Sequence, residues 1–178
     1  MLNFKFWLSY LKDNFYDKKF SSNKKKYILQ CLAATFISYF ILTTLSLISS
    51  VLVIASIAST AFIVFCAPHA KRAKTRYILG GYAVGLSMGF LCYSMMKFFI
   101  THVPFLHIHF DEIFGALAIG LSIFLMVILD VEHAPACSAS LALVISDWNY
   151  LTIIITFLAL FILIGSRFIL RKHLIQLI

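Results

Sequence analysis

Long apolar segments alternate with short polar connections along most of the chain. A helix that crosses a bilayer needs about 20 mostly apolar residues, and four segments meet that requirement: residues 28–48, 77–100, 113–131 and 150–170. Two shorter apolar segments, 49–67 and 135–146, lie between them and are richer in Ala and Ser. The pattern predicts an all-α, polytopic membrane helix bundle.

The two shorter segments decide the topology. Basic residues cluster at 24–26, 71–76 and 167–172. If both short segments cross, all three clusters face the cytoplasm and the positive-inside rule is satisfied, with both termini on that side. We therefore expect six crossings of the bacterial inner (cytoplasmic) membrane instead of four.

Six crossings form two sets of three, each ordered long, short, long. Because three is odd, the second set runs in the opposite sense to the first, which is the arrangement of an inverted repeat. Short or broken helices two and five then occupy matching positions. In transporters with this arrangement such helices meet at a binding site near the membrane midplane.

The amino-terminal segment has its own pattern. Phe4, Leu8, Leu11 and Phe15 recur at helical spacing, with basic residues around them. This favours an amphipathic helix at the membrane surface, although a helix that packs on the protein or on a second subunit has the same pattern. Residues 21–23 are expected to cap the first span. The predicted domains are this helix, 1–23, and a single transmembrane domain, 24–178.

Composition narrows the function classes. The chain is 62% hydrophobic and 12% charged, with a mean hydropathy of +0.96. The formal charge of +8 lies beside the apolar spans, so it favours contact with the lipid bilayer and argues against nucleic acid. None of the common catalytic or nucleotide-binding motifs is present. We expect no enzyme activity and no cofactor.

Ionisable groups before the second short segment are candidates for chemistry. Glu132 and His133 follow a long apolar run, and Pro135 favours a helix start directly after them. A helix N-terminus has free amide donors and a partial positive charge, so it can hold an anion. Alternatively, Glu132 only caps the helix and His133 satisfies a carbonyl group. The candidate substrate-binding groups here are Glu132, His133, the backbone of Ala136, Cys137 and Ser138, and the hydroxyls of Ser138 and Ser140.

The first short segment supplies further candidates. Ser59 and Thr60 lie among small residues that allow close approach, and Pro68 is expected to end the helix. Arg76 stands directly before the next span, where it can turn inward to meet an acidic side chain or an anion.

A small-residue face runs along the third span. Gly81, Gly85 and Gly89 recur at four-residue spacing, which is typical of a face for close helix packing. Ala116 and Gly120 on the fourth span offer a complementary face.

The predicted outward loop contains His102, His107, His109, Asp111 and Glu112. Imidazole and carboxylate groups can ligate zinc, and a metal-responsive sensor is one alternative. Nothing in the spacing fixes a ligand geometry, so we expect no metal site.

Two stretches resemble the HPP family of small integral membrane proteins, named for a His-Pro-Pro motif. Residues 57–68, continuing through Ala73, Arg76, Gly80 and Gly81, are similar to the family's small-residue helix, proline, Ala-Gln-Pro-Arg-Asn stretch and glycine pair. His133-Ala134-Pro135-Ala136-Cys137-Ser138-Ala139 stands at the place of the family's His-Pro-Pro-Ala-Gly-Ala. The resemblance covers residues 28–170.

The chain departs from the family pattern at several of these positions. Ala134 replaces the first proline and Cys137 a glycine, while Lys74 and Thr75 replace Gln and Pro. Tyr77 and Tyr82 stand where Asn and His are common. His133 and Arg76 are retained.

The family has been associated with nitrite transport, so the resemblance implies a transporter. Our first hypothesis is a transporter or channel for a small inorganic anion, with nitrite as one substrate. The alternative is a non-transporting membrane subunit or scaffold that assembles through the glycine face, with a homodimer as its simplest form.

Overall fold

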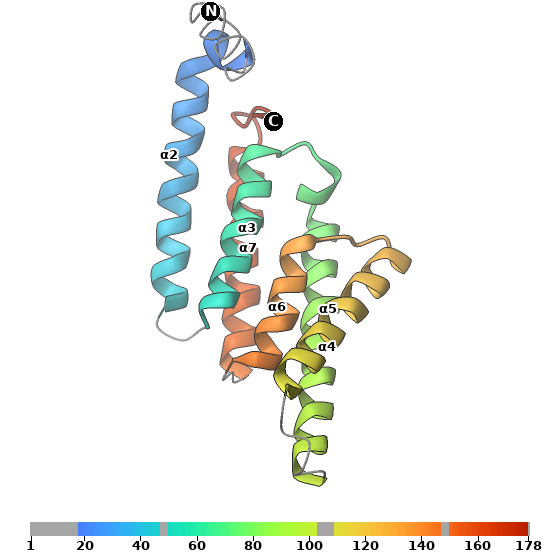
Figure 1. Ribbon diagram of the computed structural model, residues 1–178. Coiled ribbons are helices and arrows are strands. Elements are labelled where there is room, and N and C mark those ends of the chain that lie inside the picture. Colours follow the sequence, from blue (N-terminus) through green and yellow to red (C-terminus); the bar gives the residue numbers. More distant parts are fainter. Residues whose placement is uncertain (1–17, 47–49, 103–108, 147–149, 178) are drawn as a thin grey trace, which may run out of the picture.

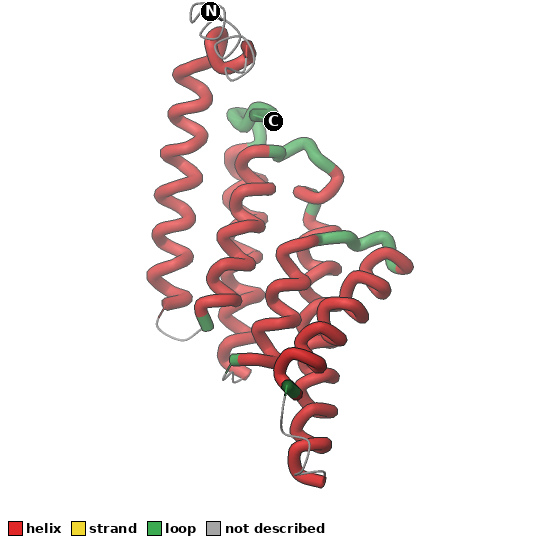
Figure 2. The backbone as a smooth tube through the Cα atoms, viewed as in Figure 1, coloured by secondary structure: helices red, strands yellow, loops and turns green. Residues whose placement is uncertain are grey.

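The structure is a computed structural model that describes residues 18–46, 50–102, 109–146 and 150–177. Helices make up nearly all of this part of the chain (Figures 1 and 2). They are α2 (Lys18–Ser46), α3 (Val51–Cys66), the 3-10 helix η1 (Lys71–Ala73), α4 (Thr75–His102), α5 (Phe110–Ile128), α6 (Ala134–Ile145) and α7 (Tyr150–Leu170). The structure confirms the predicted all-α bundle.

Four of these helices are long and apolar enough to cross a membrane: Asn23–Thr43 within α2, and α4, α5 and α7. The short helices α3 and α6 have 16 and 12 residues. At about 1.5 Å per residue they are shorter than the roughly 30 Å of a bilayer core. Each nevertheless runs in one direction, antiparallel to the helix before it, instead of turning back (Figure 1).

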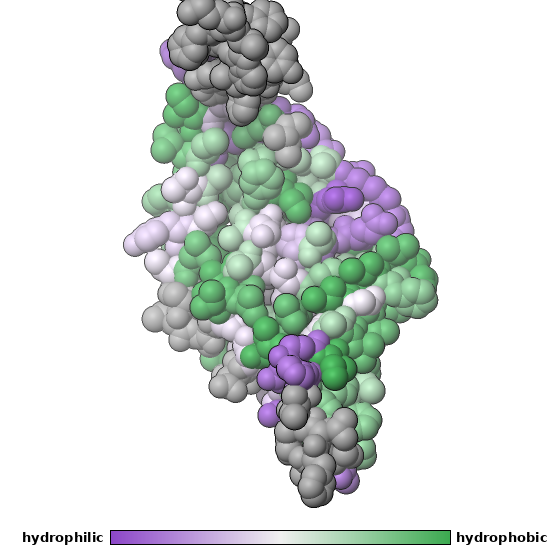
Figure 3. All heavy atoms as spheres, viewed as in Figure 1, coloured by the Kyte–Doolittle hydropathy of each residue, from purple (hydrophilic) through white to green (hydrophobic). Residues whose placement is uncertain are grey.

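Successive helices alternate in direction, so several connections gather at one end of the bundle. That end holds the start of α2, η1, the link from α5 to α6, and the end of α7 (Figure 1). We call it the basic end, because it carries the basic clusters at 24–26, 71–76 and 167–172. In Figure 3 hydrophilic residues gather near this end, and hydrophobic residues cover much of the surface below.

The helices pair in the same way in the two halves of the chain. Within each half the first helix packs on the second, α2 on α3 and α5 on α6. The third helix of each half packs on the first two of the other half: α4 contacts α5 and α6, and α7 contacts α2 and α3. The short helices α3 and α6 also contact each other. This pairing is the one that an inverted repeat produces.

The glycine face of α4 is covered by α6. A Cβ atom added at Gly81, Gly85 or Gly89 would lie 2.5 Å from His133, Ala136 or Ser140 respectively. The glycine face therefore allows close helix packing, but the prediction that Ala116 and Gly120 on the fourth span form its complementary face is wrong. Nothing lies within 4 Å of a Cβ built at Gly120.

Local chemistry ends α3 and α5. Ala67, the residue before Pro68, caps α3 in a non-helical conformation (φ −128°), because a following proline disfavours the helical region. At the end of α5, Asp130 has φ 51°, its amide donates to Val127 and that of Val131 donates to Met126. These are the two bonds of a Schellman motif. The helix ends at Ile128, before the predicted limit of 131.

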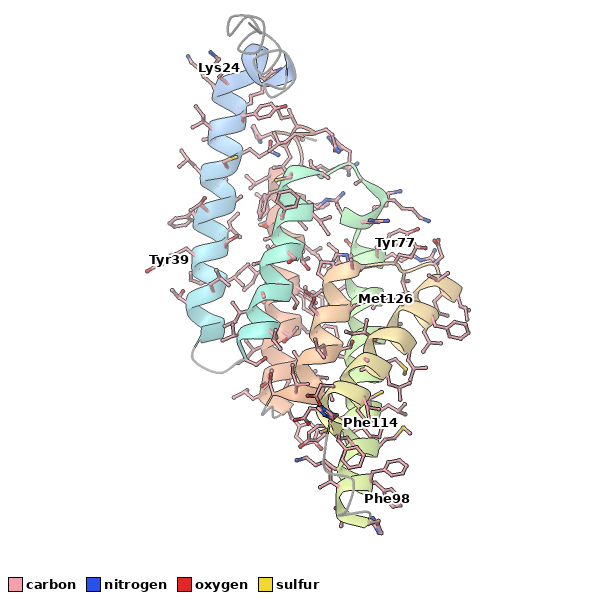
Figure 4. The ribbon with its side chains drawn as sticks, in the orientation of Figure 1. Lys24, Tyr39, Tyr77, Phe98, Phe114 and Met126 are labelled. Carbon is pink, nitrogen blue, oxygen red and sulfur yellow. The ribbon has the colours of Figure 1, made fainter. Side chains whose placement is uncertain are left out.

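Helix α2 lies at the edge of the bundle. The chain is helical from Lys18, but Asn23 has non-helical angles (φ −125°, ψ 26°), and two helices meet at a kink there. The break that we expected at residues 21–23 therefore lies at the start of the first span, Asn23–Thr43. The side chain of Tyr39 points away from the other helices (Figure 4) and is 67% exposed. Phe36 on the same helix is 75% exposed. The predicted amphipathic helix lies mostly in residues 1–17, outside the described residues.

Candidate functional site

Four polar side chains meet in the interior between α3, α4 and the start of α6. His133 Nε2 lies 3.0 Å from the hydroxyl of Thr60, which lies 3.0 Å from the hydroxyl of Tyr82. Tyr82 also donates to Ser56 at 3.1 Å. All four residues are at most 1% exposed. The structure thus brings together Thr60 and His133, two predicted site residues that lie 73 positions apart.

The hydrogen bonds of this network are compatible with both tautomers of His133. Ser56 donates its hydroxyl proton to the carbonyl of Val53, and Tyr82 donates to Ser56. Thr60 has one hydroxyl proton and three partners, the Ser56 carbonyl, the Tyr82 hydroxyl and Nε2 of His133. Nδ1 of His133 is buried and has no hydrogen-bond partner among the described residues.

The amide donors at the start of α6 differ from those predicted. The amide of Ala136 donates to the carbonyl of His133 at 2.9 Å, and those of Cys137 and Ser138 fall beyond the positions that a helix leaves unpaired. Pro135 has no amide hydrogen. The helical pattern leaves the amide of Ala134 without an acceptor in its own helix. His133 makes no side-chain cap, and no cap by Glu132 is seen.

A cavity of about 340 Å³ adjoins this helix start on the side of α5. His133 and Ala134 border it from α6, and Arg72 borders it from η1. The remaining lining residues are Ile123, Met126, Val127, Glu132 and Cys137. Two predicted residues, Glu132 and Cys137, therefore face this cavity rather than the buried network.

The other predicted residues lie elsewhere. Ser59 and Ser138 border a separate open groove of about 410 Å³ between α3 and α6, and the Ser59 hydroxyl donates to Ala55 within its own helix. Ser140 is buried against the glycine face and donates to the Cys137 carbonyl. The hydrogen bonds of Ser59 and Ser140 thus stay within their own helices and do not join the His133 network.

Arg76 does not turn inward as expected. Its side chain is 65% exposed, donates to the Leu129 carbonyl at 3.3 Å and lies 4.0 Å from Asp130. Asp130 accepts from Lys71 at 2.6 Å and from Tyr77 at 3.0 Å. The hydrogen bond from Lys71 is the main reason that the pKa of Asp130 is lowered. These bonds fasten η1 to the link between α5 and α6 (Figure 4 labels Tyr77).

Sequence reasoning missed the two other members of the network, Ser56 and Tyr82, and Arg72 beside the cavity. A signal existed for Tyr82, because it replaces a polar residue of the family pattern inside an apolar span. Ser56 lies one helical turn before Thr60 and so shares its face. Arg72 has no such signal in a cluster of basic residues.

The histidines of the far loop are only partly described. His102 stacks on Phe98 with ring centroids 4.2 Å apart, and His109 lies 3.3 Å from Glu112. His107 lies outside the described residues. Among the residues that are described, no group of three potential metal ligands lies together.

The helix pattern and the buried polar centre define an integral membrane protein of the polytopic helical class. The family model for the HPP transmembrane region matches residues 21–174, which is most of the chain, so the chain belongs to the HPP family. No curated protein and no solved structure matches it.

Proposed function

We propose that the protein transports a small monovalent anion together with a proton, and that it is not an enzyme. The observation that carries the proposal is the buried Nδ1 of His133, which has no hydrogen-bond partner among the described residues. His133 directly precedes α6 and lines a cavity. A buried polar atom without a partner is uncommon in proteins and calls for an explanation.

The neutral ring of His133 has no charge with which to hold an anion. When it takes up a proton the ring becomes an imidazolium, which is costly in an apolar interior unless a negative charge lies beside it. An anion supplies that charge. Proton and anion therefore favour each other at this site, which is the thermodynamic basis of coupled transport.

The charges around the cavity support this coupling. Arg72 and Glu132 both border it, so their charges balance, and the rim cluster of Lys71, Arg76 and Asp130 stands outside. A proton on His133 gives the cavity a net positive charge. The amide of Ala134, at the positive end of the α6 dipole, adds a donor for the anion.

The family resemblance suggests nitrite as one substrate. From the positive-inside rule we propose that the protein lies in a bacterial inner membrane with its basic end and both termini on the cytoplasmic side. Ions would then enter or leave the His133 site from the cytoplasm through the cavity beside Arg72.

The test is nitrite uptake into liposomes that contain purified protein, driven by acid on the nitrite side and corrected for protein-free liposomes. His133→Gln keeps a donor for Thr60 but cannot carry the proton. We expect a loss of at least about tenfold, the equivalent of one charge-assisted hydrogen bond, and no response to the pH gradient. His69→Gln, an exposed histidine at the same end, is the control and should transport normally.

Equal uptake by wild type and His133→Gln, at equal insertion into the liposomes, would remove His133 from the mechanism. Uptake that depends on His133 but not on the pH gradient would keep the site and refute the coupling. Formate, nitrate and chloride in place of nitrite define which anions are accepted.

No contact favours the scaffold alternative through the glycine face. α6 of the same chain covers that face at Gly81, Gly85 and Gly89, so it is not open to a second copy.

A further inference from the structure

A second cavity, of about 390 Å³, lies at the basic end between α2 and the residues that follow α7. It is remote from the His133 site in the fold, because neither α2 nor the carboxyl-terminal residues line that site. Its lining combines basic side chains from both segments with apolar ones. Lys26, Lys172 and His173 supply the first kind, and Leu29, Leu170 and Leu174 the second.

The cavity is held in shape by a buried side chain. Gln30 of α2 is 4% exposed; its amide nitrogen donates to the carbonyls of Phe65 and Ile175, and its oxygen accepts from the amide of Ile175 at 3.0 Å. The chain turns back after Leu170, and the amide of Leu177 donates to the Cys66 carbonyl at 2.9 Å. The carboxyl-terminal residues therefore form a fixed wall.

Charge and position select the ligand. Of the described residues that line the cavity, three are basic and none is acidic, which favours an anionic group. Leu29 at the cavity, and Leu32 and Phe36 further along α2, are 65%, 60% and 75% exposed. They belong to a helix that is long enough to span the bilayer. A ligand that is anionic at one end and apolar at the other matches both parts.

We propose that this cavity binds an anionic phospholipid, with the phosphate between Lys26 and Lys172 and an acyl chain along the outer face of α2. Basic pockets between helices at the cytoplasmic surface are suited to such headgroups. The bound lipid connects α2 with the segment after α7. This supports a helix whose main helix contacts, among the described residues, are with α3 and α7.

The test uses the full-length protein in detergent, with phosphatidylglycerol or phosphatidylcholine added. Bound lipid is counted by native mass spectrometry, and thermal unfolding is followed in parallel. Wild type should retain phosphatidylglycerol in preference to phosphatidylcholine and unfold at a higher temperature with it. Lys172→Gln should weaken binding of phosphatidylglycerol about fivefold, the contribution of one basic residue near a membrane surface.

Lys74→Gln is the matched control, because Lys74 is an exposed lysine of the same end that does not line the cavity. It should bind phosphatidylglycerol as wild type does. Equal retention of the two lipids, or equal loss in both variants, would refute the site. Displacement of phosphatidylglycerol by inorganic phosphate at similar concentration would show a site for phosphate alone and overturn the lipid assignment.

Discussion

His133 and Asp130 stand three positions apart and have opposite environments. His133 is 1% exposed and is held by Thr60 in the interior, whereas the Asp130 side chain is 51% exposed on the rim. The backbone explains the difference: α5 ends in a Schellman motif at Asp130, and the chain then turns back so that His133 enters the bundle. The two residues therefore have separate roles.

The role of Asp130 predicts a pH dependence. Its pKa is lowered, first by the hydrogen bond from Lys71 and then by that from Tyr77. A carboxylate with a lowered pKa in the folded state stabilises the fold above its unfolded pKa, about 3.9, and this contribution is lost as the pH falls through the lowered value. Lys71, whose pKa is raised chiefly by the same bond, keeps its contribution up to about pH 10.

Asp130→Asn should therefore unfold at a slightly lower temperature than wild type near neutral pH. The difference should shrink as the pH falls below about 3.9 and vanish below the lowered pKa of Asp130. Asn is also tolerated at positive φ, so the variant keeps the helix end and removes only the charge. Thermal unfolding across this pH range measures the effect. A difference that persists in acid would show that the charge is not its source.

At the scale of helices, the contact between α4 and α6 positions the site. The glycine face of α4 lets the backbone of α6 approach until His133 reaches Thr60 and Tyr82. Tyr82 lies on α4 itself, with its ring centroid 5.7 Å from that of His133. A change that separates these two helices should therefore disturb the polar centre.

Gly85→Ala tests this contact. The added Cβ would lie 2.5 Å from the carbonyl oxygen of Ala136, so the helices must shift, at a cost of about 1–3 kcal/mol for an overpacked interior. Gly120→Ala is the control, since nothing lies within 4 Å there and alanine favours a helix interior by about 0.5–1 kcal/mol. We expect unfolding at a lower temperature only for Gly85→Ala; equal melting temperatures would contradict close packing at this point.

At the scale of the molecule, the two halves exchange their third helices. α4 packs on the second half and α7 on the first, so neither half completes its contacts alone. The same exchange brings the two short helices together at the centre. The basic clusters then lie at one end (Figure 1), which predicts the orientation in the membrane.

Cysteine labelling measures that orientation in cells. The four native cysteines are free and are first replaced, and Lys74→Cys and Glu112→Cys are then introduced separately. A reagent that cannot cross the membrane should label position 112 from outside and position 74 only after permeabilisation. Labelling of position 74 in intact cells would reverse the proposed orientation.

The sequence by itself determined where the helices lie, that two of them are short, and the family. These properties are local: the length of an apolar run, a proline that ends a helix and the charges at its ends decide them, and most observed limits fall within a few residues of those predicted. The end of α5 differs from the predicted limit, because Asp130 in a left-handed conformation ends the helix before the apolar run is complete.

Only the tertiary structure decided which surfaces meet. The glycine pattern predicted close packing but not that α6 would cover the glycine face. No local sequence pattern indicates that His133 faces Thr60 or that Arg76 stays exposed on the rim. Faces formed by small residues look alike on any helix, so which two of them pair depends on the packing of the whole bundle. The buried network and the cavity beside it exist only once the two halves have packed together.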